Sequence, residues 1–205
     1  MFTGLIREMA RVKNFDGSRL SLLASHRPKL GDSIAINGTC LSVVSIENNG
    51  FTVELSPETL AHIATEKLSG NVHIEPAMQM GERFEGHIVQ GHIDTLGTIR
   101  SITDNGNSYD VIVDIDPEFI PLIPPKGSIT IDGVSLTVND VLPNAFRLTI
   151  IPITMRETLF GTYKKGTRVN IETDVFARYI RHILGTSPRS QTMNWDDIDR
   201  ISALY

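Results

Sequence analysis

The sequence predicts an all-β protein built from two homologous barrels in tandem, and three observations predict it. A repeat spans most of the 205 residues. Within each copy, the apolar and β-branched segments are short and end at turn residues. Helical periodicity is confined to brief pieces and to the C-terminal tail. We therefore expect two small antiparallel, Greek-key-like β-barrels plus a C-terminal helix, because closing a small sheet removes its exposed edges.

An internal duplication organises the chain. Residues 32–43 align without gaps with residues 127–138, so that Ser33 corresponds to Ser128 at an offset of 95. The alignment extends in both directions with small changes of offset, because surface loops tolerate insertions. The repeat predicts a first barrel over residues 1–87, a second barrel over residues 88–184, and a C-terminal linker and helix over residues 185–205.

Turn residues divide each copy into short strands. In the first copy, strands are predicted over residues 33–36, 41–46 and 51–55, with an Asn-Asn-Gly turn joining the last two. The second copy repeats this arrangement with a Pro-Asn turn. Short helical pieces are expected around residues 57–64 and 154–160.

Composition excludes several classes of function. A net charge of −5 argues against nucleic acid as a partner, because phosphate binding requires clustered Lys and Arg. No apolar run approaches the roughly 20 residues of a membrane helix, and the start lacks the pattern of a secretory signal. The single cysteine, Cys40, cannot form an intrachain disulfide. We expect a cytoplasmic protein with no nucleic-acid partner and no membrane partner.

The repeated loop carries a polar pair in both copies. Alternate side chains of a strand point to opposite faces, so Cys40 lies with Ser42, away from the apolar Leu41. Ser135 and Thr137 occupy the matching positions of the second copy. Singly, such residues are common beside turns, and a lone cysteine often behaves as a small buried apolar residue. Their repetition favours a polar rim that binds a ligand.

The two copies differ in the groups that could react. Cys40 corresponds to Ser135, and Leu5 corresponds to His92. A thiolate is a better nucleophile than a hydroxyl group, and an imidazole can move protons near neutral pH. Two similar sites with unlike groups suit a reaction between two copies of one substrate in different roles.

No metal site and no cofactor are predicted. His87, His92 and Cys40 are residue types that bind metals, but a spacing of five places the two histidines on opposite faces of an extended strand. The sequence contains no paired-cysteine or His-x-x-x-His pattern, no glycine-rich dinucleotide motif and no nucleophile elbow.

Several ordered motifs resemble those of the riboflavin synthases of the trimeric alpha type. The motifs are Met1–Ile6, Asn37–Val43, Gly86–Asp94, Lys126–Ile129 and Asp132–Val138. The resemblance runs from residue 1 to residue 184 and includes the duplication itself. Its specificity comes from the order and spacing of the motifs, since any one of them alone would be weak. Ser42 stands where the family often has threonine, which keeps the hydroxyl group.

The resemblance implies a dismutation. Two molecules of 6,7-dimethyl-8-ribityllumazine, bound at one site, would exchange a four-carbon unit and give riboflavin and 5-amino-6-ribitylamino-uracil, the last step of riboflavin biosynthesis. The family needs no metal or redox cofactor. It forms homotrimers in which the first barrel of one subunit and the second barrel of another share each site. The resemblance also suggests an association with lumazine synthase.

Carried onto this sequence, the resemblance implies ligand contacts in both barrels. Hydroxyl and carboxylate groups among them can hydrogen-bond a ribityl chain, and aliphatic side chains can enclose the rings. The contacts of the first barrel would be Gly4, Leu5, Ile6, Cys40, Leu41, Ser42, Glu54, Leu55, Ser56 and Thr59. Those of the second barrel would be Gly91, His92, Ile93, Lys126, Ser135, Leu136, Thr137, Thr149, Ile150, Ile151, Pro152, Ile153 and Thr154.

The resemblance also implies catalytic roles. Cys40 or a nearby hydroxyl group would add to carbon 7 of one lumazine. His92, together with Ser135 and Thr137, would assist removal of a proton from the 7-methyl group. Much of the rate would come from holding two rings in a reactive geometry.

Alternatives remain at this point. A non-catalytic antenna protein of the same fold, binding lumazine or flavin, would lose one ligand site or its reactive groups, and the presence of all four candidate catalytic residues favours the enzyme. A structural duplicate without a ligand would leave the polar rims unexplained. In the tail, helical spacing relates Trp195, Ile198, Ile201 or Ser202, and Tyr205, which indicates either an assembly helix or a helix packed on its own barrel.

Overall fold

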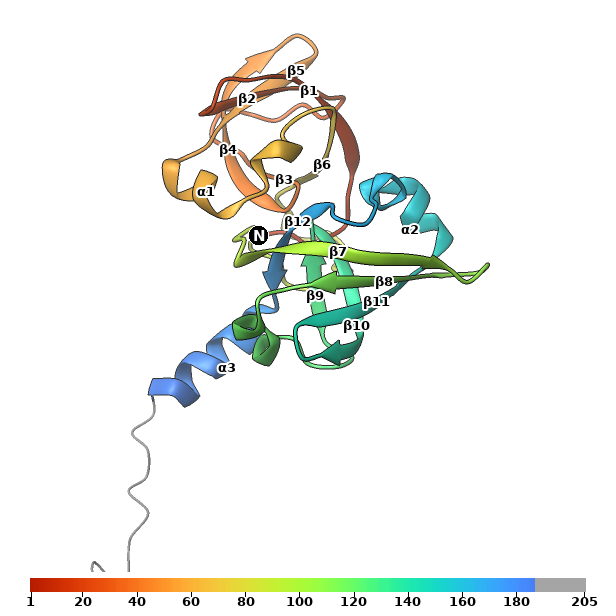
Figure 1. Cartoon of the computed structure of the whole chain (residues 1–205). Coiled ribbons are helices and arrows are strands. Elements are labelled where there is room, and N and C mark those ends of the chain that lie inside the picture. Colours follow the sequence, from red (N-terminus) through yellow and green to blue (C-terminus); the bar gives the residue numbers. More distant parts are fainter. Residues whose placement is uncertain (187–205) are drawn as a thin grey trace, which may run out of the picture.

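Two closed barrels follow one another along the chain in the computed structural model, which describes residues 1–186 (Figure 1). Every strand pair of the first barrel is antiparallel, and the neighbours follow the order β1-β2-β5-β4-β3-β6. Its strands are β1 (Glu8–Phe15), β2 (Arg19–Leu23), β3 (Ser33–Ile36), β4 (Thr39–Glu47), β5 (Gly50–Glu54) and β6 (Asn71–Pro76).

The second barrel has the same cyclic order, β7-β8-β11-β10-β9-β12, so the duplication extends to topology. Its pairs are also antiparallel. Its strands are β7 (Thr95–Asp104), β8 (Tyr109–Asp114), β9 (Ser128–Ile131), β10 (Val134–Leu142), β11 (Ala145–Ile150) and β12 (Arg168–Thr173). The predicted all-β fold of two tandem barrels is confirmed.

Short helices fill the connections, and one longer helix follows the second barrel. They are α1 (Pro57–His62), η1 (Thr65–Lys67), η2 (Pro117–Leu122), α2 (Pro152–Glu157), η3 (Leu159–Thr162) and α3 (Val175–Thr186). Helix α3 begins within the range that the sequence assigned to the second barrel and ends two residues beyond it, and it projects from that barrel (Figure 1). The predicted tail helix with Trp195 lies outside the described residues. No helix among residues 1–186 is long and apolar enough to cross a membrane.

Apolar and polar side chains alternate along the strands, and the inward-facing apolar side chains form one core in each barrel. Leu41 and Val43 of β4 are buried, whereas Cys40 is half-buried and Ser42 is exposed, as the period of two predicts. Phe51 lies fully buried in the first core. The second core repeats this arrangement around its own buried phenylalanine at the matching position of β11.

The segments that precede the two barrels are exchanged between them. We call residues 2–6 and residues 89–93 the lead segments. They meet at a bridge in which the N–H groups of Phe2 and Val89 each donate to the other's carbonyl oxygen, at 2.7 and 3.1 Å. Ile6 then packs against the core of the second barrel, and Ile93 packs against the core of the first. Each barrel is therefore completed by the other half of the chain.

A buried polar cluster joins the barrels at the turn between β9 and β10. Asp132 is fully buried, forms an ion pair with Lys67 of η1, and accepts a hydrogen bond from the Tyr163 hydroxyl at 2.5 Å. The ring of His73 bridges the barrels: Nδ1 donates to the Asp132 carbonyl oxygen at 2.9 Å, and Nε2 accepts from the Leu159 N–H at 2.7 Å. This arrangement requires a neutral imidazole, and burial lowers the pKa of His73 to about 4.

Candidate functional site

Each polar strand predicted from the sequence lies against a lead segment, which gives two related surfaces. In the first, the Cys40 N–H donates to the Gly91 carbonyl oxygen at 2.8 Å, and we call this surface the cysteine frame. In the second, the Ser135 N–H donates to the Gly4 carbonyl oxygen at 2.7 Å, and we call it the serine frame. The two frames are built by the same interaction in equivalent positions.

Glycine is required at both contacts. Gly4 and Gly91 both have φ of +79°, a conformation that other residues rarely adopt. A Cβ atom on Gly91 would lie 2.6 Å from the Cβ of Cys40, and one on Gly4 would lie 2.6 Å from the Cβ of Ser135. The absence of these side chains lets the lead segments approach the strands closely.

This exchange corrects the expected grouping of the site residues. From the resemblance, Gly4, Leu5 and Ile6 are expected beside Cys40, and His92 is expected beside Ser135. The structure does the opposite in both cases, because the lead segments meet at the Phe2–Val89 bridge and cross to the other barrel. The repeat identifies equivalent residues, but it carries no information on which barrel a connecting segment covers.

Two equivalent buried carboxylates hold the lead segments. Glu75 of β6 accepts hydrogen bonds from the N–H groups of Thr3 and Gly4 at 2.7 and 3.0 Å. Glu172 of β12 accepts from the N–H groups of Gln90 and Gly91, both at 2.8 Å. Burial raises the pKa of both glutamates, while these hydrogen bonds favour the charged form and oppose that rise. The sequence analysis aligned these glutamates without assigning them a role.

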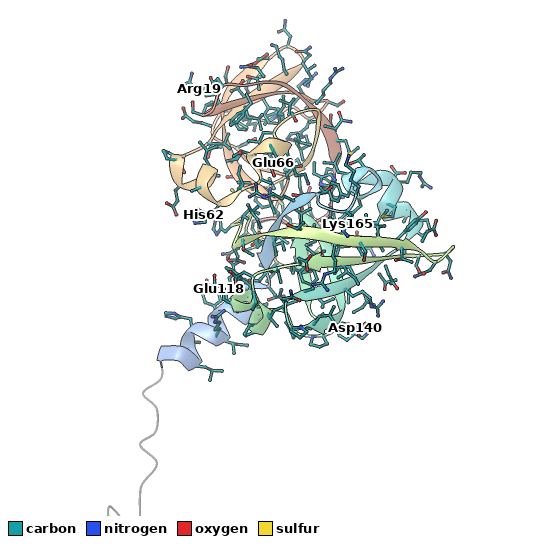
Figure 2. The ribbon with its side chains drawn as sticks, in the orientation of Figure 1. Arg19, His62, Glu66, Glu118, Asp140 and Lys165 are labelled. Atoms are coloured by element: carbon teal, nitrogen blue, oxygen red, sulfur yellow. The ribbon has the colours of Figure 1, made fainter. Side chains whose placement is uncertain are left out.

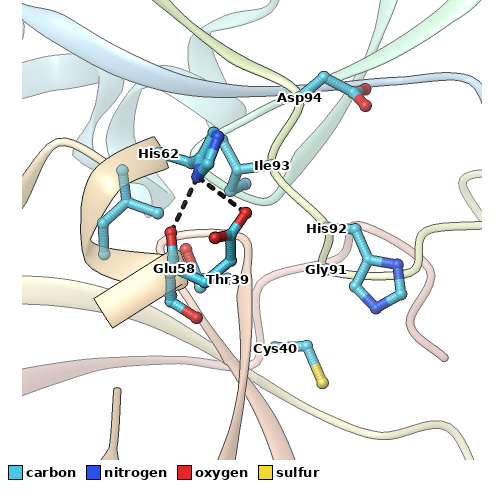
Figure 3. Close-up of a pocket in the computed structure, with 10 residues that line it drawn as sticks. Thr39, Cys40, Glu58, His62, Gly91, His92, Ile93 and Asp94 are labelled. Atoms are coloured by element: carbon cyan, nitrogen blue, oxygen red, sulfur yellow. Dashed lines mark hydrogen bonds and ion pairs between the residues drawn. The ribbon is translucent and has the colours of Figure 1, made fainter. Parts of the chain in front are cut away.

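The cysteine frame opens into a pocket of about 400 Å³, which is shown in Figure 3. Cys40 and His92 lie on one side of it, and Glu58 and His62 of α1 lie on the other. The lining residues are Thr39, Cys40, Glu58, Thr59, His62, Ile63, Gly91, His92, Ile93 and Asp94. This pocket has the size, the mixed polar and apolar walls and the titratable groups of a small-molecule site.

Helix α1 brings further polar groups to this pocket. The Ser56 hydroxyl caps the helix by accepting from the Thr59 N–H at 3.1 Å. Nδ1 of His62 donates to the Glu58 carbonyl oxygen at 2.8 Å, which leaves Nε2 as the ring nitrogen that can contact a ligand. Thr39 also lines the pocket, but its hydroxyl oxygen is buried and makes no hydrogen bond within residues 1–186. Sequence reasoning missed Thr39, Glu58 and His62.

The serine frame contains a hydrogen-bonded pair that sequence reasoning also missed. Nδ1 of His87 lies 2.7 Å from the Ser135 hydroxyl oxygen. His87 is buried, and burial lowers its pKa, which favours the neutral imidazole that can accept a proton from a hydroxyl group. His87 and His92, which were weighed as ligands of one metal, therefore belong to different frames.

The remaining predicted contacts of the first barrel are divided between core and surface. The side chain of Leu55 is buried in the first core, so only its backbone could face a ligand. Glu54 is exposed and pairs with Arg19 at 3.3 Å. Leu5 is half-buried on its lead segment, and Thr59 lines the pocket.

The predicted contacts of the second barrel are divided in the same way. Ile150 is buried in the second core, and Leu136 packs against that core while remaining half-buried. Thr137 is exposed beside Ser135 on β10. Lys126 adopts a φ of +65° at the turn before β9. At the junction of β11 and α2, Thr154 is half-buried, and Ile151, Pro152 and Ile153 are exposed.

Thr149 takes part in a polar network of the second barrel. Its hydroxyl group donates to Asp110 at 2.9 Å, and its N–H donates to the Asn139 side chain at 2.7 Å. These bonds orient β11 where it leads into α2.

Comparison with known proteins supplies the context for this geometry. A family model described as "Lumazine binding domain" matches residues 3–77 and again residues 90–174, one match in each barrel. The chain is 40% identical over 200 residues to the riboflavin synthase of Actinobacillus pleuropneumoniae, with 93% of each chain covered. It is 35% identical over 201 residues to the riboflavin synthase of Bacillus subtilis, with 94% of each covered.

Solved structures show the same fold. LumP in complex with riboflavin superposes with a TM-score of 0.76 at 22% identity, and the match covers 84% of this chain and 99% of LumP. LumP in complex with 6,7-dimethyl-8-(1'-D-ribityl) lumazine gives a TM-score of 0.74 at the same identity. At this identity the likeness concerns the two-barrel architecture.

Proposed function

We propose that this chain, which belongs to the lumazine-binding domain family, is a riboflavin synthase. It converts two molecules of 6,7-dimethyl-8-ribityllumazine to riboflavin and 5-amino-6-ribitylamino-uracil by transfer of a four-carbon unit. One observation carries the proposal: the two barrels present equivalent frames with unlike reactive groups, in a chain that matches curated riboflavin synthases along nearly its whole length.

The pocket of the cysteine frame suits one lumazine. Ile93 and Ile63 provide apolar walls for the rings, and the Thr59 hydroxyl can bond the ribityl chain or the ring edge. The Cys40 thiol is the candidate for addition to carbon 7, with hydroxyl groups nearby as the other candidates.

The serine frame suits the second lumazine. His87 can accept the proton of the Ser135 hydroxyl, and that hydroxyl or Thr137 can contact the ligand. The resemblance implies that His92, with Ser135 and Thr137, assists removal of a proton from the 7-methyl group. His87 is a second candidate base for that step.

The proposal includes a homotrimer in which sites are shared between subunits. Helix α3 supports it, since Phe176, Tyr179, Ile180 and Leu184 are all more than half exposed on a helix with an apolar stripe. The unpaired Cys40 fits the proposed cytoplasmic location. The association with lumazine synthase stays a prediction.

A direct experiment separates the enzyme from an antenna protein of the same fold. The pure protein is incubated with 6,7-dimethyl-8-ribityllumazine alone, in the presence and absence of a metal chelator. We expect riboflavin to appear at the same rate in both samples. Lumazine that binds and keeps its own fluorescence indefinitely would contradict the proposed function and support the antenna protein.

A further inference from the structure

The lead segment that carries His92 is held mainly by one carboxylate. Its residues 90–92 lie before β7, and their three consecutive N–H groups donate to Glu172, at 2.8, 2.8 and 3.2 Å. The Glu172 side chain is 1% exposed. The orientation of Gly91 and His92 in the pocket therefore depends on where this carboxylate sits.

A guanidinium group from α3 fixes the carboxylate and the segment together. Nη2 of Arg178 bonds Glu172 at 3.3 Å and the Gln90 side-chain oxygen at 2.8 Å. Nη1 of the same residue bonds Asp94 at 3.1 Å. Asp94 also accepts two hydrogen bonds from Thr173 at the end of β12, both at 2.7 Å. Arg178 thus contacts Gln90 and Asp94, on either side of Gly91 and His92, and the Glu172 carboxylate that holds these residues.

The helix position that allows these contacts is itself well defined. Asp174 caps the helix by accepting a hydrogen bond from the Phe176 N–H at 2.8 Å, directly after β12 ends at Thr173. Arg178 follows one turn later and points back toward the barrel, where its side chain is 23% exposed. The opposite face of α3 carries the exposed apolar residues described above.

The first copy lacks this arrangement. Glu75 holds its own lead segment in the same way, through Thr3 and Gly4. Chain 77–86 follows β6 there without a helix, and Arg7 acts on Glu75 through its charge, with no hydrogen bond to it within residues 1–186. In the part of the chain that the structure describes, the link to a helix exists only in the frame that contains Cys40.

We propose that Arg178 is a positioning residue that couples the placement of helix α3 to the geometry of the cysteine frame. When α3 is held in place, Arg178 keeps Glu172 and residues 90–94 in position, and His92 and Gly91 close the pocket beside Cys40. A contact made by α3, with a second copy of this chain above all, thereby influences the pocket. The part of this inference that concerns lumazine rests on the proposed function, whereas the part that concerns Cys40 does not.

The single cysteine provides the test, because Gly91 lies directly against Cys40. The rate at which a small aromatic disulfide reagent labels Cys40 is measured in the wild type and in Arg178→Met, Arg178→Lys and Arg181→Met. Arg181 is the matched control, since it lies on the same helix but bonds the Glu118 carbonyl oxygen of η2. Figure 2 labels Glu118 beside α3. Unfolding midpoints and sedimentation confirm that the variants compared are folded and equally assembled.

We expect Arg178→Met to label at least about threefold faster, because the segment over Cys40 opens more often. Arg178→Lys keeps the positive charge but lacks the planar guanidinium that bonds several partners at once. Its labelling rate should therefore lie between those of Arg178→Met and the wild type. Arg181→Met should match the wild type. In turnover assays, Arg178→Met should lose about tenfold or more in kcat/KM through misplacement of the pocket wall, with Arg181→Met again unchanged.

Two results would overturn the inference: labelling of Arg178→Met at the wild-type rate, or equal acceleration in Arg181→Met. A wild type that fails to convert lumazine would instead refute the proposed function, and the labelling result would still decide the role of Arg178.

Discussion

At the scale of the residue, the two frames depend on Gly4 and Gly91. Only glycine lets a lead segment lie directly on the polar strand. The reactive side chains then differ between frames that are otherwise equivalent. Cys40 faces the segment of His92, and Ser135 faces the segment of Leu5 and bonds His87. The asymmetry lies in the side chains, while the backbone is shared.

Gly91→Ala should disrupt the cysteine frame. The new Cβ would lie 2.6 Å from the Cβ of Cys40, in a residue with φ of +79°. Gly106→Ala is the control, since Gly106 has φ of +84° and no atom within 4 Å of the added Cβ. We expect Gly106→Ala to lower the free energy of unfolding by about 1 kcal/mol, and Gly91→Ala to lower it by about 1–3 kcal/mol more. Equal losses in urea titrations would show that the close contact carries no constraint.

Matched substitutions at Cys40 and Ser135 should have unmatched effects. Cys40→Ser keeps a group of similar size but a weaker nucleophile, so we expect turnover to fall several-fold while lumazine affinity changes by less than about tenfold. Ser135→Ala should weaken both, since it removes the partner of His87 and of a ligand. Steady-state kinetics and fluorescence titration provide the comparison. Small and equal losses in rate would mean that neither group takes part in the chemistry.

The sequence predicted the polar face of β4 and β10, because strand alternation alone decides which side chains point outward. It could not predict that Gly4 meets Ser135, since repeats define equivalent residues and not partners across a fold. The His87–Ser135 pair was missed for the same reason: the two residues are 48 positions apart and meet only through the exchange of lead segments.

At the scale of the element, the turn residues correctly predicted two hairpins. The helical pattern in the tail, which begins near Trp195, did not predict where α3 starts. The predicted Asn-Asn-Gly turn joins β4 and β5, and the Pro-Asn turn joins β10 and β11. Residues 175–184 carry apolar side chains at helical spacing after the capping Asp174, and this signal could have located α3. The tail helix predicted from Trp195 and the residues after it lies further along, beyond the described residues.

The buried polar cluster that joins the barrels should stabilise the fold less in acid, because it contains His73. The unfolded chain protonates this histidine near its ordinary pKa of 6.5, whereas the folded chain resists protonation until about pH 4. The unfolded state therefore binds more protons between these values, and stability falls as the pH drops from 6.5 toward 4. Over this window His73 should account for a loss of about 3 kcal/mol.

His73→Asn, which places at position 73 the residue found at the equivalent Asn170, removes the titrating group. We expect the variant to be less stable than the wild type at pH 7 and to lose less stability on acidification. Urea unfolding at pH 7 and pH 4.5 measures both quantities. The same pH slope in the two proteins would contradict this role of His73.

At the scale of the whole molecule, the duplication provides two ligand frames, and α3 provides the surface by which copies can associate. Ile180→Asp should prevent association, because Ile180 is 58% exposed and a buried charge without a partner is costly in an interface. Leu30→Asp, at an equally exposed apolar residue of the first barrel, is the control. We expect sedimentation to show dissociation, with loss of turnover, for Ile180→Asp alone. An active monomer would contradict the shared site.

The stoichiometry of the reaction tests the central claim most directly, because two like frames with unlike groups imply two identical substrates with different fates. The protein is supplied with 6,7-dimethyl-8-ribityllumazine as the only organic compound, and substrate and products are separated by chromatography over time. The account predicts that two lumazines disappear for each riboflavin and each 5-amino-6-ribitylamino-uracil formed. Riboflavin formed without the uracil product, or no consumption of lumazine at all, would contradict it.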